Sequence, residues 1–176
     1  MSSSRLVALG AVVLQLDSGA LQTKLVGWLT DCRRLVIAGV GNSLRSDDGL
    51  GVALVGRLGK LPRNVMAIDC GAVPETYVGP IRRFLPSHIL IVDAADIGLS
   101  PGSVRLVSPE EIVGMALSTH TLPLRVFTDY LVGQTHAKVA LLAVQPKNTD
   151  FGEGLSPEIE ETLRLIVDVV EGLLIK

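Results

Sequence analysis

Residues 35–58 read LVIAGVGNSLRSDDGLGVALVGRL, and this stretch decides the fold. Its first six residues are all apolar and predict a short buried strand. The polar, glycine-rich segment 41–49 is typical of a loop, and a helix is then predicted from about Asp48 to Leu58. Asp47 or Asp48 can cap this helix, because a carboxylate accepts hydrogen bonds from the first free N–H groups. The stretch therefore predicts a strand, a loop and a helix in succession.

The same alternation continues along the chain. Further apolar strands are predicted at 65–69, 88–94 and 138–144, and helices are predicted at 21–29, 76–84, 108–117, 123–131 and 156–176. The segment SVRLV at 103–107 alternates and follows a Pro-Gly turn, which predicts an antiparallel edge strand. Strands that alternate with helices indicate a three-layer α/β fold, in which a mostly parallel sheet carries helices on both faces.

Length and composition favour one domain with an aliphatic core. We divide the 176 residues into an N-terminal extension with a leading helix (1–33) and a core (34–176). Apolar residues make up 48% of the chain and aromatic residues only 3%, which suits strands buried between helices. The net charge is −2 without a long basic run, so nothing indicates nucleic-acid binding. Cys32 and Cys70 lie far apart, which is compatible with the reducing cytoplasm.

The N-terminus contains an apolar run, LVALGAVVLQL at 6–16, that follows a single arginine. It is shorter than the ~20 residues that a membrane helix needs. One positive residue also makes a poor signal peptide. We therefore expect this run to pack on the domain, and we expect no membrane insertion.

Asp93 is the most informative candidate for chemistry. It ends the apolar run 89–92, where a carboxylate is costly unless it is paired or coordinated. In parallel sheets ligands bind beyond the carboxyl ends of the strands, so Asp93 and Asp48 can meet in one crevice. Each has a structural alternative: Asp93 as a partner for a neighbouring loop, and Asp48 as the cap of the following helix.

His120 lies in the loop STHTLP at 118–123, between two predicted helices. A loop histidine is commonly no more than a solvent-facing polar residue. Together with the two carboxylates it would complete a set of two oxygens and one nitrogen for a divalent metal with open coordination positions. The same groups would also serve as general acid and base on a water molecule. His88, at the start of a strand, and His136, in a connection, are weaker candidates.

A dinucleotide-binding domain is a competing interpretation. The sequence GVG at 39–41 follows a strand, and Asp69 ends the next strand at the position that holds a ribose in such domains. The full GxGxxG pattern requires glycine at position 44, which is Leu44 here. Neither a GxSxG elbow nor an HExxH motif is present, which argues against serine hydrolases and zincins.

Five motifs, in order along the chain, resemble those of the hydrogenase maturation endopeptidases. They are GVGNSLRSDDGLG at 39–51, DCG at 69–71 followed by PE at 74–75, LIVDAADIGLSPGSVRLVSPEEI at 90–112, STHTLPL at 118–124 and VQP at 144–146. The resemblance covers residues 34 to 172. The PE pair and the segment around His120 are most similar to the formate-hydrogenlyase-type and archaeal branch.

This resemblance implies a twisted, mostly parallel five-stranded sheet between helices. It also implies a hydrolase, an aspartic-type endopeptidase that recognises nickel in the precursor of a nickel–iron hydrogenase large subunit and removes its C-terminal extension. The catalytic and nickel-contacting positions of the family fall on Asp48, Asp93 and His120. Nickel would arrive with the substrate, no tightly bound organic cofactor is expected, and the protein should be a monomer.

Three alternatives stay open at this point. Cys70 stands where the family commonly has glycine, and it is either a small buried residue or a reactive thiol beside the site. The attacking water is activated either by a carboxylate or by the metal. A non-enzymatic nickel-binding maturation chaperone is the alternative function.

Overall fold

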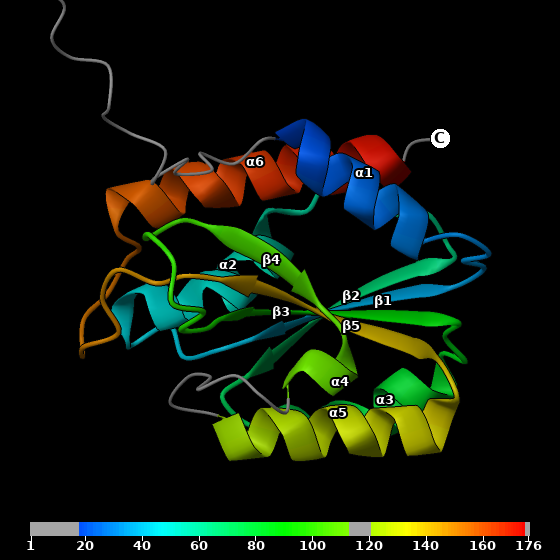
Figure 1. The fold of residues 1–176 in the computed structure, drawn as a ribbon. Coiled ribbons are helices and arrows are strands. Elements are labelled where there is room, and N and C mark those ends of the chain that lie inside the picture. The colour runs from blue at the N-terminus through cyan, green and yellow to red at the C-terminus, as the bar shows by residue number, and fades with distance from the viewer. Residues whose placement is uncertain (1–17, 113–120, 175–176) are drawn as a thin grey trace, which may run out of the picture.

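The computed structural model of the protein describes residues 18–112 and 121–174. Within these ranges five strands form one sheet in the order β2-β1-β3-β5-β4 (Figure 1). The strands are β1 (Leu35–Val40), β2 (Val65–Gly71), β3 (His88–Ala94), β4 (Val104–Val107) and β5 (Lys138–Val144). Neighbouring strands pair in parallel except β4, which lies at one edge and pairs antiparallel with β5. The predicted edge strand is therefore confirmed.

Helices cover both faces of this sheet, which confirms the three-layer α/β fold (Figure 1). They are α1 (Ser18–Trp28), α2 (Leu50–Arg57), α3 (Val78–Arg83), α4 (Pro109–Ile112), α5 (Thr121–Thr135) and α6 (Pro157–Leu174), with the short 3₁₀ helices η1 (Ser46–Gly49) and η2 (Pro74–Tyr77). Helices α1, α2 and α6 cover one face of the sheet, and α3 and α5 cover the other.

The two faces follow from the alternation of side chains along each buried strand. In β3, Ile89 and Ile91 pack toward α3 and α5, whereas Leu90 and Val92 pack toward α1, α2 and α6. Every residue of β3 is buried, as expected for a parallel strand covered on both faces. This alternation places the next residue, Asp93, on the face that α3 and α5 cover.

Helix boundaries differ most clearly from the predictions in two places, and the predicted end of helix 108–117 lies outside the described residues. The helix predicted from Asp48 begins instead at Leu50, because residues 46–49 form a tighter 3₁₀ turn. Helix α5 runs to Thr135, past the predicted end at Leu131. The apolar run 6–16 lies outside the described residues, so its predicted packing stays a prediction.

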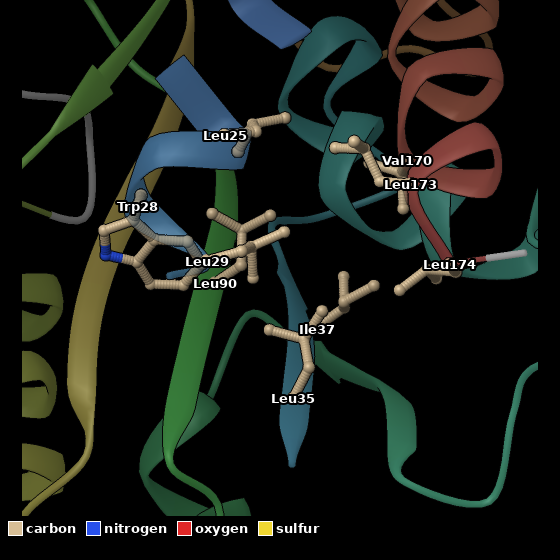
Figure 2. A pocket seen from close by; sticks show the side chains of 9 residues that line it. All are labelled: Leu25, Trp28, Leu29, Leu35, Ile37, Leu90, Val170, Leu173 and Leu174. Atoms are coloured by element: carbon tan, nitrogen blue, oxygen red, sulfur yellow. The ribbon is translucent and has the colours of Figure 1, made fainter. Parts of the chain in front are cut away.

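Helix α1 lies beside α6 on the same face of the sheet, as Figure 2 shows from close by. Leu25 and Trp28 of α1 meet Leu35 of β1 and Leu90 of β3, and Val170 of α6 closes the other side. These side chains line a small apolar recess with little open space. The leading helix is thus part of the hydrophobic core.

None of the described helices combines the length and the apolar character that crossing a membrane requires.

Candidate functional site

Asp48 lies in η1, just beyond the carboxyl end of β1, and its side chain is buried. Its Oδ2 accepts a hydrogen bond from the backbone N–H of Asn42 at 3.0 Å, and its backbone carbonyl accepts from the same N–H at 3.2 Å. Neither η1 nor α2 has a side-chain cap. The interpretation of Asp48 as a helix cap is therefore wrong, because its carboxylate closes the loop at Asn42.

Asp93 is the sixth residue of β3 and is fully buried. Among the described residues neither of its carboxyl oxygens has a hydrogen-bond partner. The alternative role of Asp93 as a partner for a neighbouring loop is thus unsupported within the described residues. A buried carboxyl group without a partner costs stability, so its presence calls for a reason other than folding.

The pKa of Asp93 is raised well above its usual value. Burial is the main cause, because it disfavours the charged form, and the neighbouring charge of Asp48 is the second. The nearby amide of Ala94 offsets these effects only in part. Because β1 and β3 are parallel neighbours, their carboxyl ends bring the two carboxyl groups within electrostatic reach of each other, as the sequence predicted.

His120, the third predicted member, lies outside the described residues. Helix α5 begins at the next residue, Thr121. This helix packs on the face of the sheet toward which Asp93 points. Among the described residues no three His, Cys, Asp or Glu side chains gather in a way that could hold a metal ion. The proposed ligand set therefore depends on His120 and stays a prediction.

Asp47 has a structural role that sequence reasoning missed. Its fully buried carboxylate accepts hydrogen bonds from the backbone N–H groups of Lys147 and Asn148, both at 2.9 Å. It also accepts from the backbone N–H of Ser156 at 2.6 Å and from the Ser156 hydroxyl at 2.9 Å. The expectation that Asp47 caps α2 is wrong, because these four donors come from the β5–α6 loop, about one hundred residues away in sequence.

Backbone hydrogen bonds continue this connection along both loops. The N–H of Ser46 donates to the carbonyl of Gly152 at 2.8 Å, and the N–H of Gly152 donates to the carbonyl of Leu44 at 2.9 Å. The guanidinium of Arg45 donates to the carbonyl of Thr149 at 3.2 Å. We call residues 42–48 and 145–156, joined in this way, the paired loops. They hold Asp48 in a fixed position beyond β1.

Gly41, one of the glycines that suggested a dinucleotide site, has a packing role instead, and so has Gly51 of α2. Gly41 has φ +134°, and a Cβ on it would overlap the backbone carbonyl of Asp48. A Cβ on Gly51 would overlap the carbonyl oxygens of Val40 and Val92. Because both glycines lack Cβ atoms, α2 and η1 can approach the ends of β1 and β3 closely.

The surroundings of Asp69 and Cys70 distinguish between the roles that the sequence left open for them. The carboxylate of Asp69 accepts a hydrogen bond from the N–H of Gly71 at 2.9 Å and so stabilises its own turn. Cys70 is buried in the core on the α3 and α5 face. Burial, followed by the charge of Asp69, raises the pKa of the Cys70 thiol to about 12. Cys70 is therefore the small buried residue rather than a reactive thiol.

The two other histidines lie at the opposite end of the sheet from Asp48 and Asp93. His88 starts β3 and is buried against Trp28, with ring centroids 5.1 Å apart in an edge-to-face arrangement. His136 is exposed in the short connection between α5 and β5. Both therefore stay weak candidates.

Comparison with known proteins gives a consistent result. A family model described as hydrogenase maturation protease matches residues 52–173. The chain is similar to the hydrogenase 3 maturation protease of Escherichia coli K12, with 34% identity over 139 residues that cover 78% of this chain and 88% of that protein.

Solved structures agree. The [NiFe] hydrogenase maturation protease HycI from Thermococcus kodakarensis KOD1 superposes with a TM-score of 0.80 at 34% identity, covering 87% of this chain and 99% of that one. The hydrogenase maturating endopeptidase HybD from Escherichia coli gives a TM-score of 0.68 at 26% identity, covering 80% and 91%.

Proposed function

Because the chain belongs to the hydrogenase maturation protease family, and is thus an endopeptidase, we propose that it removes the C-terminal extension from the precursor of a nickel–iron hydrogenase large subunit. Nickel in this proposal belongs to the precursor, so it is part of the substrate. Asp48, Asp93 and His120 contact that nickel and place the scissile bond beside the two carboxyl groups.

The buried carboxyl group of Asp93, which has no hydrogen-bond partner among the described residues, is the observation that carries this proposal. A carboxyl group that is buried without such a partner in the described part of the chain, and that is repelled by Asp48, destabilises the fold. A divalent cation from outside would satisfy both carboxylates at once, since it replaces their mutual repulsion with attraction. The pair is therefore suited to a charged metal that arrives only with the substrate.

Positioning then accounts for cleavage. A metal held by both the precursor and this protein fixes the peptide bond relative to the carboxylates, and such orientation lowers the barrier to reaction. One carboxylate, or the metal, activates the attacking water. His120 completes the coordination from the residue that precedes α5. The protein in this proposal acts as a monomer in the cytoplasm, and the unpaired cysteines of the described chain fit such a reducing compartment.

Mass spectrometry of a nickel-loaded precursor tests this function. Incubation with the protein should shorten the precursor by a C-terminal peptide, whereas the Asp93→Ala variant should leave its mass unchanged. Circular dichroism of the variant provides the control for folding. An unchanged precursor mass with the wild-type protein would refute the proposed function, and full activity of Asp93→Ala would refute the site assignment.

A further inference from the structure

Exposed apolar side chains surround the carboxyl end of the parallel sheet. Each of the four parallel strands is followed by a loop or turn that carries one large apolar side chain at least half exposed to solvent. These are Leu44 after β1, Val73 after β2, Leu99 after β3 and Phe151 after β5. The loop that contains Phe151 lies at the left of Figure 1, between β5 and α6. These four exposed apolar side chains lie at the same end of the sheet as Asp48, and such a group of exposed apolar side chains indicates a contact surface.

Phe151 is the most exposed of these side chains, at 85%, and Leu44 is 51% exposed. Their backbones are neighbours, because the N–H of Gly152 donates to the carbonyl of Leu44 at 2.9 Å. Both residues belong to the paired loops and flank the backbone hydrogen bonds that join them. A phenylalanine held almost fully in water gains nothing for folding, whereas exposed aromatic residues are enriched at protein interfaces.

The backbone that presents Phe151 is held in place on both sides. The hydroxyl of Ser46 donates to the carbonyl of Asp150 at 3.1 Å, and the N–H of Asp150 donates to the side-chain oxygen of Asn148 at 2.9 Å. The four hydrogen bonds of Asp47 fix the rest of the loop. A preordered apolar contact loses little conformational entropy on binding, which favours affinity.

We propose that Leu44 and Phe151 form a docking surface for the polypeptide of the hydrogenase precursor, beside the site where Asp48 and Asp93 meet its nickel. The inference rests on the proposed function, because the occupant is the substrate protein itself. The position of Leu44 explains the choice of partner, because Asp48 ends the same loop that carries Leu44. Phe151 is joined to this loop by the backbone hydrogen bonds of the paired loops. A precursor whose metal reaches Asp48 is therefore brought close to the loop that carries this apolar surface.

Binding measurements with and without nickel test the docking surface separately from cleavage. Biolayer interferometry would give Kd values for immobilised precursor, nickel-loaded and nickel-free, against the wild-type protein, Phe151→Ser, Leu44→Ala and the double variant. Each single change should raise Kd about tenfold, which corresponds to about 1.4 kcal/mol, and Phe151→Leu should restore most of the affinity. The loss should be the same for nickel-free precursor, since the contact is with polypeptide.

Leu85→Ala provides the matched control, because Leu85 is 71% exposed and lies before β3, at the opposite end of the sheet. Its Kd should equal that of the wild type. A Kd for Phe151→Ser within twofold of the Leu85→Ala value would overturn the docking surface, as would a wild-type protein that does not bind the precursor. If the wild type binds the precursor without shortening it, and Phe151→Ser binds more weakly than Leu85→Ala, the proposed function alone would be refuted.

Discussion

Asp47 and Ser156 form a double hydrogen bond, in which both the backbone N–H (2.6 Å) and the hydroxyl (2.9 Å) of Ser156 donate to the Asp47 carboxylate. Ser156 immediately precedes α6, and Asp47 immediately precedes Asp48. The start of the last helix is thus connected through one side chain to the candidate site.

Replacing Asp47 with asparagine should therefore destabilise the protein and reduce activity together. The amide keeps one acceptor oxygen but points an NH₂ group at donors that previously met the second oxygen. We expect a loss of about 2–4 kcal/mol in the free energy of unfolding, measured by urea denaturation. Asp150→Asn, an exposed change on the same loop, should have no effect, and an equally stable Asp47→Asn protein would disprove this role.

Asp93→Asn, unlike Asp47→Asn, should stabilise the protein, and it should abolish processing of the precursor. The pKa of Asp93 is raised in the folded protein, so the free energy of unfolding falls as pH rises from the unfolded-state pKa near 3.8 toward the folded-state pKa. Because the amide introduced by Asp93→Asn cannot ionise, the variant lacks this pH-dependent fall in the free energy of unfolding. We expect a gain of about 1–2 kcal/mol at neutral pH.

Thermal and urea unfolding between pH 4 and pH 8 would show whether the stability gain of Asp93→Asn grows with pH. Asp96→Asn, an exposed change two residues beyond β3, is the control and should leave the profile unchanged. A destabilised Asp93→Asn protein would mean that the carboxyl group supports the fold.

His88 should make the protein sensitive to mild acid. Burial and the charge of Lys138 lower the pKa of His88 below 6.5, and contributions from Trp28 and Asp31 oppose them only in part. The unfolded chain therefore takes up a proton before the folded protein does, and stability declines as pH falls from 6.5 toward the folded-state pKa, by at most about 1.4 kcal/mol per pH unit.

The His88→Phe variant keeps an aromatic ring beside Trp28 and cannot titrate. Its free energy of unfolding should lack the acid-dependent decline between pH 7 and pH 5 that the wild type shows. His136→Ala, at an exposed position, should retain that decline. Parallel pH profiles for the wild type and His88→Phe would contradict the prediction.

Two glycines of α2 offer a matched comparison. Gly51→Ala places a Cβ against the carbonyl oxygens of Val40 and Val92 and should push α2 away from the sheet, whereas nothing lies within 4 Å of a Cβ on Gly56. We expect Gly51→Ala to lower the free energy of unfolding by several times ~1 kcal/mol. Gly56→Ala should be neutral or stabilise the protein by about 0.5–1 kcal/mol. Thermal denaturation of both variants decides the comparison, and equal effects would refute the close approach.

The strands and Asp93 were predictable from sequence because their signals are local. A run of apolar residues that ends in a carboxylate predicts both a buried strand and a carboxylate in a buried position at the end of that strand. The edge strand 104–107 was likewise marked by its own alternation and by the preceding turn. Sequence spacing also placed Asp48 and Asp93 at neighbouring strand ends, because parallel strands share one carboxyl edge.

The role of Asp47 could not be predicted in the same way. Its donors at 147, 148 and 156 belong to a loop distant in sequence, and nothing nearby distinguishes Asp47 from Asp48 as a helix cap. Only the fold shows that one carboxylate of the pair holds the paired loops together while the other closes the loop at Asn42. His120, predicted mainly from the family resemblance, stays a prediction.

Helix α1 lies over an apolar part of the sheet, where Leu25 and Trp28 cover Leu35 and Leu90 (Figure 2). A chain that began at residue 34 would leave this surface open to water beside α6. Such a shortened protein should bind hydrophobic dyes and self-associate. The residues of α1, which precede the family motifs, therefore shield this apolar part of the sheet from water.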